Sequence, residues 1–313
     1  MTGAPRARHR PMLQRVEILL VPDTSAASMA SPVMGSTPHE RGSDSDRHPN
    51  ILPLSCGDAT GSHLGEMMST SANEAAQRSR ITHMLDVQSV DRSNPAFVSV
   101  TLRGALAAGV IPDGPTSWVK VFPPHLDSRT GRAYTIRRFD AARDELVVDI
   151  ISRRQGGLLS DWIARDLQAG AQLGIAGPRE CKAFKGNADW YLLLGDETAL
   201  PAIASMLEAA QGRDVEAIVE VPFPDYTYVR SPRLRYLFRG REDNDKESYL
   251  IHAVDTIGNR PGKGEIWIAG EAGMVKALRN HCRHIWIGRG HSITATGYWK
   301  MGEQDYRDDE AFG

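Results

Sequence analysis

The chain has 313 residues, a formal net charge of −2 and an apolar content of 41%, which together allow two domains with ordinary hydrophobic cores. The near-neutral charge argues against bulk binding to nucleic acid, and no run reaches the roughly 18 apolar residues that an integral membrane segment needs. Cys56, Cys181 and Cys282 are far apart and lack metal-ligand spacing, which favours a reducing, cytoplasmic compartment and no metal site.

The first part of the chain has an unusual composition. No Phe, Trp or Tyr precedes Phe97, and Ser, Ala, Gly, Pro and Asp are frequent there. Such a segment cannot bury enough apolar area to offset its ordering entropy. We therefore predict that residues 1–78 form a disordered extension. Whether they belong to the native protein stays open, because Met67, Met68 and Met84 are candidate internal starts.

Short strand patterns follow over about 100 residues. Apolar and polar residues alternate over 87–102, and further strands are indicated at 118–122, 132–139 and 145–152. Short strands joined by turns are typical of a small antiparallel β-barrel. We place this domain at 79–184.

The pattern then changes to strands alternating with helices, which indicates a parallel α/β sheet. The predicted strands are 190–194, 215–221 and 265–269, the predicted helices are 198–210 and about 273–282, and 248–254 is either a strand or a short helix. We predict a nucleotide-binding type of α/β domain at 185–302, followed by a tail at 303–313.

Two groups of polar residues in the barrel region suggest phosphate and flavin chemistry. Arg132 lies two positions before Tyr134 and three before Thr135; a guanidinium binds phosphate and a phenol packs on a flat heterocycle. Gly157, Ser160 and Trp162 follow at the start of a short predicted helix, where backbone N–H groups bind anions. The alternatives are a surface arginine beside a packed tyrosine, and a tight turn with a core tryptophan.

Two further groups lie in the α/β region. Asp196, Thr198 and Ala199 follow a buried strand, where α/β sheets place ligands, although a structural helix cap is an alternative. Trp299 and Lys300 come near the C-terminus, and their alternative is a tail that packs onto the body. Neither a G-x-G-x-x-G fingerprint nor a Walker P-loop is present.

Together and in this order, the groups resemble the siderophore-interacting protein family, FAD-binding ferric-siderophore reductases related to the ferredoxin-reductase superfamily. The most specific matches are 195–202 (GDETALPA), 269–271 (AGE) and 297–299 (GYW). The resemblance implies an FAD site in which Arg132 faces the pyrophosphate, Tyr134 the ribityl and isoalloxazine, and Thr135 the ring edge. The other implied FAD-binding residues are Gly157, Ser160, Trp162, Asp196, Thr198, Ala199 and Trp299.

The chain departs from the family pattern at a few positions. Arg153 stands where the family has histidine, and Leu158 and Leu159 replace a Pro-Ala pair in the loop that faces the pyrophosphate. Glu180 replaces the last glycine of the family's G-P-R-G motif.

The resemblance implies an enzyme in which FAD carries the redox chemistry and no side chain is a catalytic acid or base. NADH, NADPH or a ferredoxin supplies electrons, and Fe(III) in a ferric siderophore receives them. Lys182, Lys185 and Lys300 are the expected contacts to an anionic siderophore. The alternatives are a general NAD(P)H:flavin reductase or diaphorase and a non-catalytic siderophore-binding protein. The sequence assigns no pair of arginines to the 2′-phosphate of NADPH. Arg230, Arg233 and Arg235 follow the second predicted α/β strand at a plausible distance, but Pro222 and Pro224 lie in the intervening loop.

Overall fold

The structure is a computed structural model. It describes residues 83–124, 131–152, 157–180, 183–184, 186–240, 248–258, 260–286, 289–303 and 306. The extension predicted at 1–78 lies outside the described residues, as do Arg153, Lys182 and Lys185 and all of the predicted tail except Glu303 and Tyr306.

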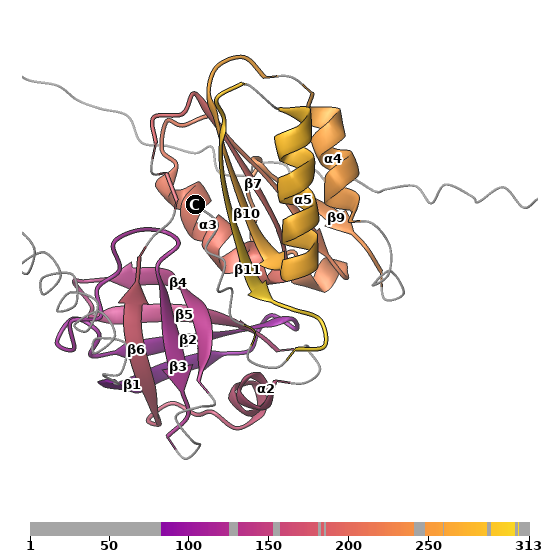
Figure 1. The fold of residues 1–313 in the computed structure, drawn as a ribbon. Helices are drawn as coiled ribbons and strands as arrows, with labels where there is room; N and C mark the ends of the chain where they lie inside the picture. The colour runs from indigo at the N-terminus through magenta and orange to yellow at the C-terminus, as the bar shows by residue number, and fades with distance from the viewer. Residues whose placement is uncertain are drawn as a thin grey trace, which may run out of the picture. The chain divides into compact units, whose positions relative to one another are not determined.

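The N-terminal half of the described chain is a closed antiparallel barrel (Figure 1). Its strands pair in the order β1-β2-β5-β4-β3-β6. They are β1 (His83–Asp91), β2 (Phe97–Arg103), β3 (Trp118–Phe122), β4 (Arg132–Asp140), β5 (Glu145–Ile151) and β6 (Gln172–Arg179). The short helix α2 (Leu158–Arg165) lies between β5 and β6 in sequence. The barrel predicted from the sequence is confirmed, and β6 is a strand that the pattern did not reveal.

The C-terminal half is a five-stranded sheet in the order β11-β10-β7-β8-β9, with all neighbours parallel. Its strands are β7 (Trp190–Asp196), β8 (Val215–Val221), β9 (Leu234–Phe238), β10 (Gly264–Glu271) and β11 (Ser292–Trp299). Its helices are η2 (Glu197–Ala199), α3 (Leu200–Ala209), η3 (Pro224–Tyr226), α4 (Tyr249–Ile257) and α5 (Ala272–Ile285). The predicted α/β domain is confirmed. The segment 248–254, for which both a strand and a short helix were considered, contains the N-cap Ser248 and the start of α4.

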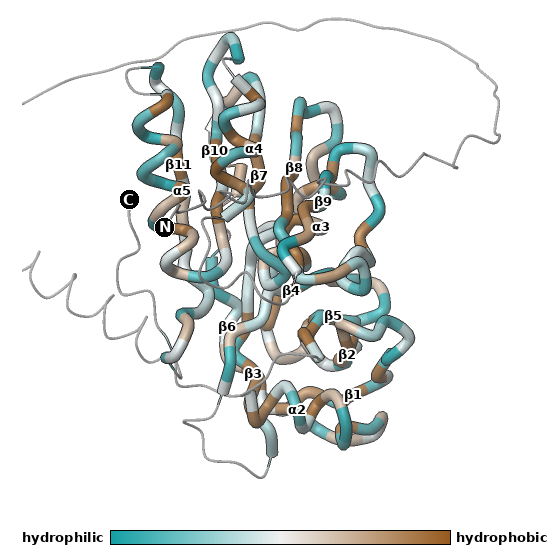
Figure 2. The backbone as a smooth tube through the Cα atoms, turned by 90° about the vertical axis from the view of Figure 1, so that its right-hand side faces the viewer, coloured by the Kyte–Doolittle hydropathy of each residue, from teal (hydrophilic) through white to brown (hydrophobic). Residues whose placement is uncertain are grey.

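Alternation along β7 explains how the sheet is covered on both faces. Tyr191 and Leu193 join the core cluster that contains α3, whereas Leu192 and Leu194 join the cluster that contains α4 and α5. Successive side chains of a strand point to opposite faces, so a continuous apolar run is what a strand covered on both faces requires. Figure 2 shows this apolar character around β8 and α3.

The segment 292–299 is a strand for which the sequence analysis made no prediction. Trp299 ends β11, which pairs along β10 from Glu265↔Ser292 onward. β11 is an edge strand with a mixed burial pattern, so its periodicity is weak. Only its pairing with β10 makes it a strand.

The barrel and the sheet meet through a buried polar network on β4 and β5. Asp149 accepts hydrogen bonds from Ser99 Oγ at 2.5 Å and from Tyr228 Oη at 3.0 Å. Arg137 binds Glu208 of α3, and its backbone carbonyl accepts from Ser205 Oγ at 2.6 Å. Burial raises the pKa of Asp149, and its hydrogen-bond donors oppose that effect. Because α3 packs on β4, the strand that carries Arg132 and Tyr134 lies beside the helix that follows Asp196.

Candidate functional site

The first group of predicted flavin residues is assembled by β4 and α2. The hydroxyl oxygens of Tyr134 and Ser160 lie 3.1 Å apart and share a hydrogen bond. Tyr134 and Trp162 are both partly buried and pack against the barrel core. Burial raises the pKa of Tyr134, and the nearby Arg132 opposes this rise. Four of the predicted residues, which are Arg132, Tyr134, Ser160 and Trp162, therefore lie in one region.

The start of α2 fits a phosphate ligand. Gly157 is the N-cap residue and makes no side-chain cap hydrogen bond, so the first backbone N–H groups of the helix have no capping side chain to accept from them. A positive helix end with available donors favours an anion. With Arg132 nearby, this donor set fits the pyrophosphate of FAD. Thr135 differs, because it is buried in β4 rather than exposed at the group.

The second group lies at the carboxyl end of β7, where Asp196 joins several elements. Its Oδ1 accepts from the backbone N–H of Thr198 at 2.8 Å and from the Thr198 hydroxyl at 2.5 Å. Its Oδ2 accepts from the backbone N–H of Glu271 at 2.8 Å and from the indole N–H of Trp299 at 2.8 Å. Asp196 is 2% exposed. The carboxylate therefore ties β7 to the ends of β10 and β11 and orients Trp299.

Glycines make this junction possible. An added Cβ on Gly195 would lie 2.5 Å from the Cβ of Ala199 and 2.6 Å from the carbonyl oxygen of Ala269. Gly270 has a φ of +143° and its Cβ would lie 2.7 Å from the Asp196 carboxyl carbon. Glycine is the residue that allows such close approach. Asp196 and Ala199 are buried, and Thr198 donates to Asp196 from both its backbone N–H and its hydroxyl. The contact of these three residues with FAD stays a prediction.

A buried ion pair next to this junction was not predicted. Glu197 is 5% exposed, and both of its carboxylate oxygens accept from Arg239 Nη2, at 2.8 and 2.7 Å. Burial raises the pKa of Glu197, Asp196 raises it further, and Arg239 opposes both. The pair spans 42 positions, so no local pattern could have identified it.

The C-terminal cation is also paired. Lys300 Nζ forms an ion pair with Glu303, three positions later, and lies 6.0 Å from the ring centroid of Tyr306. Tyr306 in turn lies against Gly297, where an added Cβ would be 3.0 Å from its ring. Lys300 is exposed and paired with Glu303, which neutralises part of its charge. Its contact with a siderophore stays a prediction. The i,i+3 spacing of this pair was visible in the sequence.

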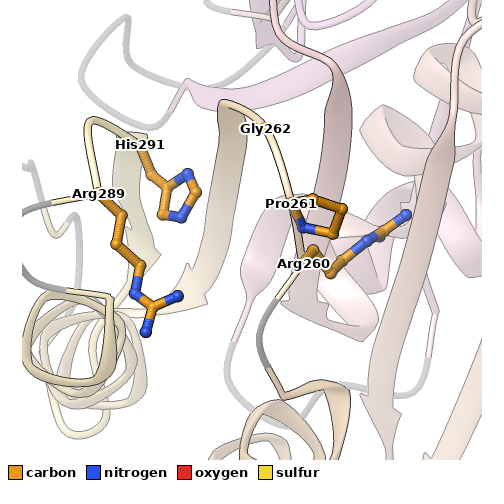
Figure 3. A pocket seen from close by; sticks show the side chains of 5 residues that line it. All are labelled: Arg260, Pro261, Gly262, Arg289 and His291. Atoms are coloured by element: carbon orange, nitrogen blue, oxygen red, sulfur yellow. The ribbon is translucent and has the colours of Figure 1, made fainter.

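A pocket among the described residues lies at the opposite edge of the sheet. Its volume is about 420 Å³, and it is lined by Arg260, Pro261, Gly262, Arg289 and His291. These residues precede β10 and β11, so they lie at the amino-terminal ends of parallel strands. Figure 3 shows the guanidinium of Arg260 turned away from His291. Arg260 forms an ion pair with Asp214 at 2.5 Å. None of the predicted site residues lines this pocket, and we give it no role.

The described residues show neither a cluster of metal ligands nor a membrane-spanning helix. No group of three or more His, Cys, Asp or Glu side chains there is arranged to hold a metal ion. No helix in the same ranges is long and apolar enough to cross a membrane.

An antiparallel barrel followed by a parallel α/β sheet defines the ferredoxin-reductase-like class of folds. The ferredoxin–NADP⁺ reductase of Neisseria gonorrhoeae, solved with FAD and NADP, has a TM-score of 0.52 and 13% identity to this chain, covering 70% of it and 99% of that structure. At this identity the likeness concerns the fold alone.

The family follows from the sequence models. Residues 123–182 match the siderophore-interacting FAD-binding domain, and residues 188–302 match the siderophore-interacting protein model. The chain therefore belongs to the siderophore-interacting protein family. A siderophore utilization protein from T. fusca shares this structure, with a TM-score of 0.62 and 29% identity over 72% of this chain and 95% of that one.

Two curated relatives complete the comparison. An uncharacterized protein of Mycobacterium tuberculosis is 35% identical over 191 residues, which cover 56% of this chain and 66% of that protein. The chain thus matches slightly less than two thirds of that relative. The ferric vibriobactin reductase of Vibrio cholerae is 27% identical over 240 residues, covering 67% of this chain and 86% of that enzyme.

Proposed function

We propose that this chain is an FAD-dependent oxidoreductase that reduces Fe(III) in ferric siderophores and releases Fe(II). The observation that carries the proposal is the contact between Tyr134 and Ser160, because it joins two predicted flavin residues that are 26 positions apart. The match to the siderophore-interacting FAD-binding domain supports the cofactor. The similarity to a ferric vibriobactin reductase supports the substrate.

The residues present divide into binding and orienting roles. Arg132 and the first backbone N–H groups of α2 would bind the pyrophosphate, and Tyr134 would pack on the ribityl and isoalloxazine. Trp299 would cover the ring system, held in orientation by Asp196. Bound FAD supplies the redox chemistry, and the protein supplies binding, orientation and electrostatics.

The electron donor in this proposal is a reduced pyridine nucleotide, with a ferredoxin as the alternative. A nucleotide would bind at the carboxyl edge of the parallel sheet, where α/β folds place such ligands. The proposed substrate contact among the described residues is Lys300. Lys182 and Lys185 stay predictions, as does the cytoplasmic compartment.

The test begins with the visible spectrum of the purified protein after incubation with FAD. The flavin-loaded protein is then reduced with dithionite under anaerobic conditions, and a ferric siderophore is added together with a ferrous chelator. We expect reoxidation of the flavin and formation of the coloured Fe(II) complex.

Each other result identifies a different function. Reoxidation by quinones or ferricyanide but by no ferric siderophore would replace the proposal with a general flavin reductase. A colourless protein that takes up no FAD but binds ferric siderophore would be a binding protein.

A further inference from the structure

The ion pair of Glu197 and Arg239 lies at the carboxyl edge of the sheet. Arg239 follows β9, and besides binding Glu197 it donates from Nη1 to the backbone carbonyl of Glu220 at 3.1 Å. Its guanidinium is therefore held at the end of β8, between the first turn after β7 and the last residues of β8. It is mostly buried, with its side chain 16% exposed.

The end of β8 is the position at which an α/β sheet distinguishes NAD from NADP. In such sheets the pyrophosphate lies at the helix after the first strand, and the adenosine ribose reaches the end of the neighbouring strand. An acidic residue there accepts from the ribose 2′-hydroxyl, whereas an available arginine accommodates a 2′-phosphate. Here β7, α3 and β8 form such a unit, and Glu220 lies near the end of β8.

Two of the described arginines near this region, Arg233 and Arg235, lie away from the carboxyl edge. Arg233 donates to the carbonyl of Ala210 at 3.3 Å, and Arg235 lies 3.7 Å from Glu216. Because β9 runs parallel to β8, starting from Ala217↔Leu234, both arginines are at the amino-terminal edge. Arg230 is exposed and follows Val229, whose carbonyl accepts a hydrogen bond from the Tyr236 hydroxyl at 2.8 Å. A strand rises about 3.3 Å per residue, so Arg233 is about 20 Å from Arg239 along the strand.

From this geometry we infer that the donor site discriminates against a 2′-phosphate, so that the pyridine nucleotide donor is NADH rather than NADPH. The inference rests on the proposed function. Glu197 neutralises Arg239, whose guanidinium lies at the end of β8. The carboxylate of Glu220 lies beside this guanidinium and accepts a hydrogen bond from Ser248 Oγ at 2.7 Å. Within the part of the chain that the structure describes, a 2′-phosphate would meet carboxylates there instead of an available guanidinium. Like charges placed together lower affinity strongly, and we expect at least about a tenfold difference.

The test uses ligands without a nicotinamide ring, so that it does not depend on electron transfer. Isothermal titration calorimetry would measure the binding of ADP-ribose and of 2′-phospho-ADP-ribose to the FAD-loaded protein. We expect ADP-ribose to bind at least about tenfold more tightly. Equal or tighter binding of the phosphorylated ligand to the wild-type protein would overturn the inference, whatever the variants do.

A variant pair locates the effect. Glu197→Gln frees Arg239, so it should improve the affinity for 2′-phospho-ADP-ribose about tenfold and leave ADP-ribose unchanged. Glu216→Gln, which removes a carboxylate that faces Arg235 and Arg260 at the amino-terminal edge, should change neither. An equal gain in both variants would show that the pair at β8 is not the cause and would overturn the inference.

Failure of the inference and of the proposed function can be told apart. If neither nucleotide fragment binds, the nucleotide donor and this inference are both wrong. Reduction of a ferric siderophore by the dithionite-reduced protein then decides separately whether the oxidoreductase function stands.

Discussion

The hydrogen bonds around Asp196 allow a quantitative prediction. Asp196→Asn keeps the shape of the side chain but replaces one acceptor oxygen with an NH₂ donor. That donor must then face either the N–H and hydroxyl of Thr198 or the N–H groups of Glu271 and Trp299. Each buried donor that loses its acceptor costs roughly 1–3 kcal/mol, so we expect a loss of about 3 kcal/mol or more.

The expected loss corresponds to a large shift in melting temperature. For a folded body of about 150–250 residues, each kcal/mol shifts Tm by about 2–4 °C, so Tm should fall by about 6–12 °C. Differential scanning calorimetry would measure the fall, with Asp166→Asn, at an exposed position that ends α2, as the control. A Tm within about 2 °C of the wild-type value would refute the structural role that we assign to Asp196.

Three further predictions concern cofactor, substrate and pH. Arg132→Ala should weaken FAD binding about ten- to a hundredfold in a fluorescence titration, because a charge-assisted hydrogen bond is worth roughly 1.5–3 kcal/mol. Arg138 is exposed on the same strand, and Arg138→Ala should leave FAD binding unchanged. Glu303→Gln should free Lys300 and speed the reduction of an anionic ferric siderophore at low salt. The gain in rate should be lost at 1 M salt, where the Debye length is about 3 Å. A gain that persists at high salt would contradict the electrostatic explanation. Burial raises the pKa of Glu220 above its ordinary 4.5. The folded state therefore binds this proton more tightly, and stability falls as pH rises from 4.5 through the raised pKa. Urea denaturation of Glu220→Gln should show a smaller fall in stability, and a pH profile identical to that of the wild-type protein would contradict this.

The sequence predicted the elements whose signal is local. The apolar run of β7 and the alternation of the barrel strands are set by whether each residue faces a core, and that periodicity is readable without neighbours. The motif residues were predicted with their order and spacing, and Tyr134 and Ser160 do lie together. The strands β9 and β11 were not predicted, because short or edge strands have too few buried positions for a clear hydrophobic period.

What only the tertiary structure decided is which side chains meet at the carboxyl edge of the sheet. Asp196 was predicted as a cofactor contact, but the order β11-β10-β7 places the donors of Glu271 and Trp299 on its carboxylate. Arg239 reaches Glu197 only because β9 lies beside β8. Such contacts depend on strand order, which brings together residues far apart in the chain, and no local periodicity encodes that order.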